Sequence, residues 1–258
     1  MREHWIEFNR SCAQASARGS IRRRPGLEML WSNTALVINN LTAVIGDDPI
    51  SEQELSRCAH DALDDAAGAK VPWIFGLPET MFPAGLDAAS PVLADTGLQY
   101  MMYMTVMECE GPLKPRLRPL PEDVEILRVS TPAQAFDALN LNSNAYGMPV
   151  AVTNDVLNAH TYFSDPRRDF GFVVYNRDGI AVSTATAIIL DGWAYVAAVA
   201  THPEHRQRGY AEIALRTAVD AAGCSHTALD ASRMGQPLYA QMGYCPLHRW
   251  NFWMPQPA

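Results

Sequence analysis

The stretch HPEHRQRGYA, residues 202–211, decides how the rest of the chain is interpreted. The apolar run AYVAAVA at residues 194–200 precedes it and is typical of a buried strand. Residues 212–222 follow, and their apolar side chains recur at helical spacing. The sequence therefore predicts a strand, a short polar turn and a helix, with Gly209 where the helix begins.

Gly209 lies where a helix attracts anions. The first turn of a helix has backbone N–H groups without intrahelical partners, and it carries the positive end of the helix dipole. A glycine lets a phosphate approach the backbone, because no Cβ stands in the way. We expect the N–H groups of this turn to bind phosphate and its arginines to add positive charge. The residues concerned are Arg206, Gln207, Arg208, Gly209, Tyr210 and Ala211.

The turn resembles the phosphate-binding motif of the GNAT-superfamily N-acetyltransferases, which has the pattern Q/R-x-x-G-x-G/A. Its defined positions hold Arg206, Gly209 and Ala211. The strings LDAS at 229–232 and PLYAQMGY at 237–244 extend the resemblance, and the second is similar to the family's L-Y-E-x-L-G-F segment. The resemblance implies an α/β (α+β) fold, with a mixed, mostly antiparallel central sheet flanked by helices.

The resemblance also implies which residues handle acetyl-CoA. The end of the strand before the motif, Val199, Ala200 and Thr201, should part from its neighbour and contact the pantetheine arm. The N–H of Val199 is expected to polarise the thioester carbonyl. Tyr239 occupies the tyrosine position of the L-Y segment and is the expected general acid for the leaving thiolate. Ser232 stands where many relatives have an asparagine that contacts the CoA arm.

The general base is left open. Relatives often place a glutamate on the strand before the motif, whereas residues 193–201 contain no carboxylate. Asp230 on the next strand and His160 before a hairpin are candidates, and a purely structural role is the alternative for each.

The leading hypothesis for function is an acetyl-CoA-dependent N-acetyltransferase. It would move the acetyl group to a primary amine of a small or amino-acid-like molecule, by direct attack in a ternary complex. A non-catalytic acyl-CoA-binding sensor or scaffold is the second hypothesis. A longer acyl donor or a hydroxyl acceptor is a further enzymatic option.

A proline-rich basic linker at residues 111–123 predicts the domain boundary. We expect an N-terminal lobe at 1–118 and the acetyltransferase domain at 119–258. The first lobe resembles the amino-terminal portion of some two-lobed GNAT proteins, but it has no counterpart of the motif turn. A degenerate GNAT-like copy should not bind CoA, and an unrelated α+β cap is the alternative. The lobe could wall the acceptor cleft or mediate a homodimer.

Bulk composition excludes several classes of function. The net charge is −8 with 48% hydrophobic and 19% charged residues, which is typical of a globular protein and not of a general nucleic-acid binder. The five cysteines form no C-x-x-C pair, so neither a zinc site nor a disulfide framework is indicated. The first residues lack a signal-peptide core, and no apolar run nears the ~20 residues of a membrane span. We expect a cytoplasmic protein without a metal.

Local patterns predict elements in the first half. Residues 1–30 are expected to be helical and polar, with Arg22–Arg24 ending at Pro25, a helix breaker. Ser51 and Glu54 have the spacing of a capping box and predict a helix start.

The second half has its own local signals. Thr131 is expected to cap a helix that runs through Ala138, and residues 139–149 to form a polar loop. Two strands, 170–175 and 180–189, are expected to form a hairpin because an Asp-Gly pair lies between them.

Overall fold

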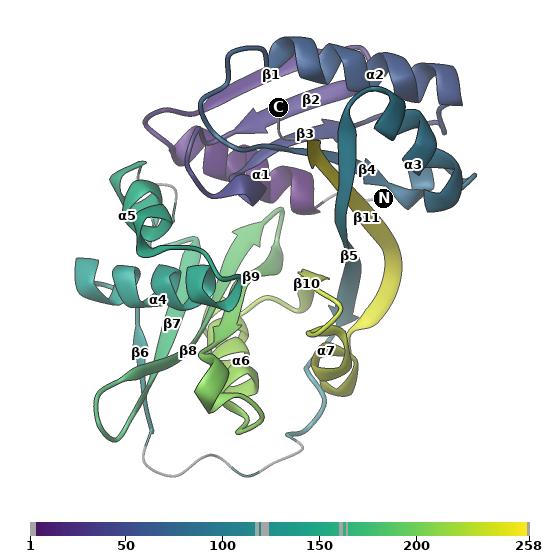
Figure 1. Ribbon diagram of the computed structural model, residues 1–258. Helices are drawn as coiled ribbons and strands as arrows, with labels where there is room; N and C mark the ends of the chain where they lie inside the picture. Colours follow the sequence, from purple (N-terminus) through teal and green to yellow (C-terminus); the bar gives the residue numbers. More distant parts are fainter. Residues whose placement is uncertain (1–3, 117–118, 120–123, 160–161, 164, 257–258) are drawn as a thin grey trace. The chain divides into compact units, whose positions relative to one another are not determined.

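The computed structural model describes residues 4–116, 119, 124–159, 162–163 and 165–256 (Figure 1). The chain forms two compact units. The N-half unit comprises Trp5–Val106 with Leu247–Ala258, and the C-half unit comprises Met1–His4 with Met107–Pro246. None of the described helices is long and apolar enough to cross a membrane.

A mixed, mostly antiparallel sheet forms the centre of the C-half unit. Its strand order is β5-β10-β9-β8-β7-β6. Pairing is antiparallel from β6 through β9 and parallel between β9 and β10. The strands are β5 Leu98–Glu110, β6 Val124–Arg128, β7 Asp169–Asn176, β8 Ala181–Leu190, β9 Trp193–Thr201 and β10 His226–Ala231. This architecture confirms the predicted fold class.

Helices cover both faces of this sheet (Figure 1). Successive side chains of a strand point to opposite faces. Val173 of β7 accordingly shares a buried cluster with Leu141 of α4, whereas Phe172 and Val174 share one with Ile213 of α6. The helices are α4 Pro132–Ala145, α5 Val150–Ala159, α6 Tyr210–Ala222 and α7 Gln236–Met242, and a short 3-10 helix, η3, spans Pro203–His205.

The N-half unit contains strands in the order β1-β2-β3-β4-β11-β5. β11 is the last strand of the chain, and its Trp253 pairs with Phe75 of β4. Trp253 is 1% exposed and belongs to the core that also holds Leu55 and Leu93. The remaining elements are α1 His4–Ala15, β1 Ser20–Arg24, β2 Leu27–Trp31, η1 Val37–Asn39, β3 Asn40–Val44, α2 Glu52–Asp65, β4 Ile74–Pro78, η2 Glu79–Met81, α3 Leu86–Asp95 and β11 Cys245–Pro255.

The two units repeat one arrangement, a helix between two parallel strands. β3, α2 and β4 form it in the N-half unit, and β9, α6 and β10 form it in the C-half unit. The helix starts differ, however. The predicted capping box closes α2: Ser51 Oγ accepts from the Glu54 N–H, and the Glu54 carboxylate accepts from the Ser51 N–H at 2.8 Å. A carboxylate of the chain itself therefore lies where α2 would otherwise attract an anion.

The prediction of a helical, polar segment at residues 1–30 is wrong beyond Ala15. Arg22–Arg24 lie in β1, which pairs antiparallel with β2 through a turn at Gly26, where φ is +78°. β2 is buried throughout and supplies hydrogen-bond partners to this exposed strand. Pairing with a buried strand therefore outweighs the local preference of the arginines.

The predicted polar loop at 139–149 is also wrong in its first half. Thr131 and Gln134 form a capping box that starts α4 as expected, but the helix continues to Ala145. Asn142 and Ser143 are polar yet buried, and the Ser143 hydroxyl accepts a hydrogen bond from Thr153 of α5 at 3.0 Å. The polar side chains join two helices here instead of marking a loop.

The predicted boundary at 118/119 touches residues outside the described ranges and stays a prediction. Along the sequence, the chain passes from one compact unit to the other between Val106 and Met107 and between Pro246 and Leu247. Each of these points lies within a strand, β5 or β11.

Candidate functional site

The start of α6 is open to solvent or ligand. Gly209 is its N-cap residue with φ +83° and ψ 4°, the left-handed conformation that glycine adopts without strain. The first backbone bond of the helix runs from the Ile213 N–H to the Gly209 carbonyl. No side chain caps the helix, and a Cβ built on Gly209 would meet no atom within 4 Å. The space beside the Gly209 Cα is therefore open, and no side-chain cap occupies the helix start, as an anion site requires.

The turn before α6 is held by its own backbone and by Arg206. Arg206 Nε donates to the Thr201 carbonyl at 3.3 Å, so part of the guanidinium fixes the loop to the end of β9. Gln207 has φ +62°, an uncommon conformation for a side-chain-bearing residue. Arg208 is exposed. Of the two arginines predicted to add positive charge, Arg206 contacts the end of β9 and Arg208 is exposed at the surface.

β9 and β10 part before either strand ends. Their parallel pairing stops at Val196 and Leu229, although β9 continues to Thr201 and β10 to Ala231. A parallel pair that separates in this way exposes backbone groups along the inner edges of both strands.

A β-bulge reshapes the parted end of β9. Thr184 of β8 faces Ala200 and Thr186 faces Ala197, so two residues of β9 oppose one of β8. Ala198 in this bulge has φ +52°. Beyond it, Ser183 Oγ donates to the Ala200 carbonyl at 2.8 Å. Ser183 Oγ also hydrogen-bonds Thr201 Oγ1 at 2.9 Å, so the outer edge of the strand end is fixed to β8.

Tyr239 lies on α7 with its ring buried, at 8% exposure. Burial, with smaller contributions from Tyr146 and Tyr244, raises the pKa of Tyr239 well above its usual value. The Tyr244 ring packs edge-on against it, with the centroids 6.0 Å apart. The phenol therefore stays protonated at neutral pH and is able to donate a proton or hydrogen bond.

Asp230 lies directly after the last paired residue of β10. Tyr195 Oη on β9 donates to its Oδ2 at 2.8 Å. Tyr195 is 1% exposed, whereas Asp230 is half-buried. A buried phenol thus holds the carboxylate at the point where the two strands separate. The other candidate base, His160, lies outside the described residues.

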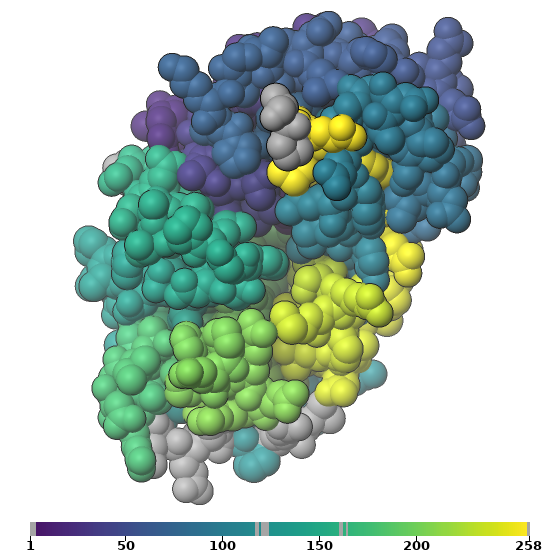
Figure 2. Space-filling view, viewed as in Figure 1, coloured from purple at the N-terminus to yellow at the C-terminus, as the bar shows by residue number. Residues whose placement is uncertain are grey.

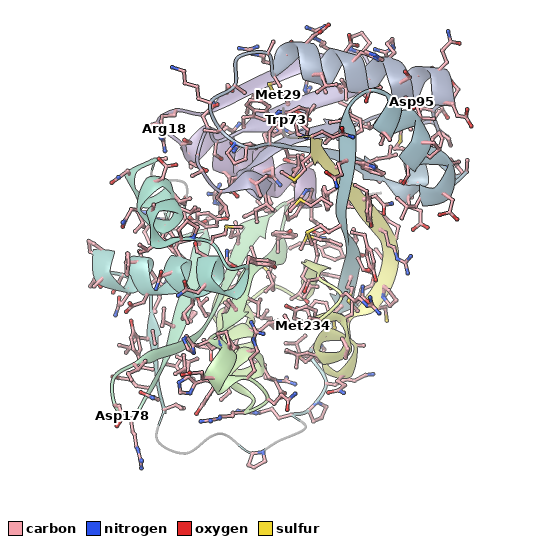
Figure 3. All side chains as sticks on the ribbon, in the orientation of Figure 1. Arg18, Met29, Trp73, Asp95, Asp178 and Met234 are labelled. Atoms are coloured by element: carbon pink, nitrogen blue, oxygen red, sulfur yellow. The ribbon has the colours of Figure 1, made fainter. Side chains whose placement is uncertain are left out.

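Ser232 begins the loop between β10 and α7. Its hydroxyl oxygen accepts a hydrogen bond from the Gly235 N–H at 3.3 Å, and its carbonyl accepts from the same N–H at 2.9 Å. Met234 of this loop, labelled in Figure 3, is 68% exposed. The loop is therefore a tight turn with Met234 extending outward.

The predicted site residues gather at one edge of the C-half sheet. β9 and β10 are parallel, so their carboxyl ends lie at the same edge, where the turn before α6 and the loop before α7 begin. α6 and α7 are both visible on the face shown in Figure 2. Val199–Thr201, the 206–211 turn, Asp230, Ser232 and Tyr239 all belong to this edge or to the helices that follow it.

The model of the Acetyltransferase (GNAT) family matches residues 138–244. These residues are a GNAT acetyltransferase domain. The match contains α6, its preceding turn, and α7 with Tyr239, and this domain supports an acyltransferase.

Solved structures extend the GNAT fold to both units. A GCN5-related N-acetyltransferase from Kribbella flavida has a TM-score of 0.71 at 17% identity, covering 100% of this chain and 97% of that one. A functionally unknown conserved protein from Staphylococcus epidermidis has a TM-score of 0.67 at 14% identity, covering 92% and 93%. A tandem GNAT protein from the clavulanic acid biosynthesis pathway has a TM-score of 0.57 at 12% identity, covering 90% and 79%. A search of curated proteins finds no match.

The family model does not match the N-half unit, whereas the similar solved structures also cover that unit. Their coverage confirms a two-lobed GNAT fold. The closed start of α2 agrees with the prediction that this half lost its phosphate turn, whereas its failure to bind CoA stays a prediction.

Two features of the GNAT domain escaped prediction from sequence. Nothing in the run of alanines and valines marks Ala198 as the bulge, because no glycine is present. Tyr195 offered a signal, since it is the one residue with a polar group in the run 194–200. The described residues contain no group of three or more His, Cys, Asp or Glu side chains suited to a metal ion.

Proposed function

We propose that the protein transfers an acetyl group from acetyl-CoA to the primary amine of a small or amino-acid-like molecule. The observation that carries the proposal is the open first turn of α6 beside the parted ends of β9 and β10. Such a turn suits a diphosphate, and parted strands suit an extended arm with amide groups. The residues present therefore fit acetyl-CoA as co-substrate.

In the proposed binding mode the N–H groups of residues 207–211 receive the diphosphate. Arg206 holds the turn, and Arg208 adds charge from the surface. Val199, Ala200 and Thr201 line the pantetheine arm together with Ser232. The Val199 N–H adjoins the bulge and would polarise the thioester carbonyl.

The amine nitrogen then attacks the thioester carbonyl carbon, and the carbon–sulfur bond breaks as the amide forms. Asp230 would take the proton that the amine loses, directly or through water. Tyr239, whose raised pKa keeps its phenol protonated at neutral pH, would donate a hydrogen bond and then a proton to the departing thiolate. Tyr239 regains its proton from the nitrogen as the amide forms, and the proton that Asp230 took from the ammonium group passes to solvent. The products are the N-acetylated amine, free CoA and one proton, so atoms and charge balance.

The acceptor amine is proposed on chemical grounds. The half-buried carboxylate of Asp230, held by Tyr195, favours a substrate amine that arrives as a cation and gives up a proton to this carboxylate. The five cysteines form no disulfide among the described residues, which supports the cytoplasmic location that the sequence suggests.

The test combines binding and turnover. The purified full chain is titrated with acetyl-CoA by calorimetry, and acetylation of a panel of amines, amino acids and alcohols is followed by mass spectrometry. Tyr239→Phe is measured alongside. The proposal predicts saturable binding and an acetylated amine whose yield falls in the variant. Binding without any product would instead support the sensor or scaffold, and absence of binding would refute both.

A further inference from the structure

Gly235 is a glycine whose backbone does not need one. Its φ of −81° and ψ of −27° lie in the right-handed helical region that every residue adopts. Its conformational freedom is therefore not used, in contrast to that of Gly209. Another reason must account for the absence of a side chain at this position.

The space beside Gly235 is filled by Tyr239. A Cβ built on Gly235 would lie 2.7 Å from Cε2 of the Tyr239 ring, and 3.3 Å from both its Cζ and its hydroxyl oxygen. The first distance is shorter than any ordinary carbon–carbon contact. All three nearest atoms belong to this one side chain, so the glycine makes room for the phenol.

The ring is confined on its other sides as well. Tyr244 packs edge-on against it, and the ring is almost completely buried. The Tyr239 N–H donates to the Gly235 carbonyl at 3.2 Å, so the two residues are also joined through the first turn of α7. The Gly235 N–H is in turn fixed to Ser232. The hydroxyl position is therefore set by a short, closed group of contacts.

We infer that Gly235 is a positioning residue for the Tyr239 hydroxyl in acetyl transfer, an inference that rests on the proposed function. An alanine at this position would force the ring to turn about the Tyr239 Cα–Cβ bond. The hydroxyl lies at the far end of the ring, so a small rotation moves it most. Misplacement of a catalytic group by about 1 Å lowers turnover on the order of 100-fold.

The test is a double-mutant cycle of Gly235→Ala and Tyr239→Phe in the full chain. Gln241→Ala, an exposed change on the same helix, is the control. Gly235→Ala should lower kcat roughly 100-fold and leave the KM for acetyl-CoA within about twofold. The double variant should be no slower than Tyr239→Phe alone, because the hydroxyl to be positioned is already absent. Wild-type turnover in Gly235→Ala, or an additive loss in the double variant, would overturn the inference.

A second measurement does not depend on activity. If Gly235→Ala lowers the Tm, then Gly235→Ala combined with Tyr239→Leu should recover part of that loss relative to Tyr239→Leu alone, because the clashing ring is gone. Equal Tm losses in both backgrounds would show that the glycine does not make room for the ring. Absence of acetyl transfer in the wild type refutes the proposed function, whereas the Tm cycle still decides whether Gly235 accommodates Tyr239.

Discussion

Replacement of Gly209 separates folding from phosphate binding. The residue has φ +83°, and a left-handed conformation costs a side-chain-bearing residue about 1–2 kcal/mol. A Cβ meets nothing within 4 Å, so no steric cost is added. Gly209→Ala should therefore lower the Tm by about 2–8 °C, at about 2–4 °C per kcal/mol for a chain of this size. Gly209→Glu should lose less, because a carboxylate at a helix start gains about 0.3–1 kcal/mol.

Acetyl-CoA binding should be weakened more by Gly209→Glu than by Gly209→Ala, the opposite of the order expected for the Tm. The glutamate side chain introduced by Gly209→Glu would place its carboxylate where we propose that the diphosphate binds. Loss of two hydrogen bonds to charged phosphate oxygens costs about 3–6 kcal/mol, at about 1.5–3 kcal/mol each. That corresponds to a Kd for acetyl-CoA about 10²- to 10⁴-fold higher. Gly209→Ala adds neither charge nor much bulk, and its Kd should rise less than about tenfold.

The assay is calorimetric titration of acetyl-CoA into each variant, with the Tm of the free protein measured in parallel. Gly209→Gln separates bulk from charge. Gly223→Ala controls for backbone strain, because Gly223 is the C-cap of the same helix, with φ +66° and open space around its Cβ position. If Gly209→Glu binds acetyl-CoA as Gly209→Ala does, the phosphate does not lie at this turn.

Three further predictions concern the acid, the base and the core. Tyr239→Phe should lower kcat about 10²- to 10⁴-fold with little change in acetyl-CoA affinity. The pKa of Tyr239 is raised in the folded state, so the free energy of unfolding should fall as pH rises above about 10, the ordinary pKa of a tyrosine. Urea titrations should show a smaller fall at alkaline pH in the variant than in the wild type. Asp230→Asn should abolish most turnover, and Tyr195→Phe should lower kcat less. Neither variant should change the Kd for acetyl-CoA measured by calorimetry. Equal rates in Asp230→Asn and wild type would show that Asp230 is not the base. Trp253→Ala should destabilise the N-half unit by about 3–5 kcal/mol, and an unchanged denaturation midpoint would contradict its place in that core.

Sequence predicted the elements whose signals are local. The Ser51 capping box and the Thr131 helix cap are confirmed, and so are the helix at Gly209 and the hairpin over 169–190. Each depends on residues a few positions apart, which fix their own hydrogen bonds whatever lies elsewhere in the chain.

The misses depend on partners that are distant in sequence. Arg22–Arg24 form a strand because β2 pairs with them, and the α4 extension is held by a contact from Thr153. The contact between Tyr195 and Asp230 joins two strands 35 residues apart. A resemblance to a family placed the site residues along the sequence, but it gave neither the bulge at Ala198 nor the space at Gly235.

β11 has a consequence for synthesis of the chain. The N-half unit needs residues 247–258, which leave the ribosome only after all of residues 107–246. Translation of residues 107–246 at about 5–20 residues per second therefore leaves this core incomplete for on the order of ten seconds. During that interval Phe75 and Leu77 lack their antiparallel partner, and β4 is an unprotected apolar edge. The nascent protein should therefore depend on chaperones, and premature termination near residue 246 should yield aggregate from the half that was made first.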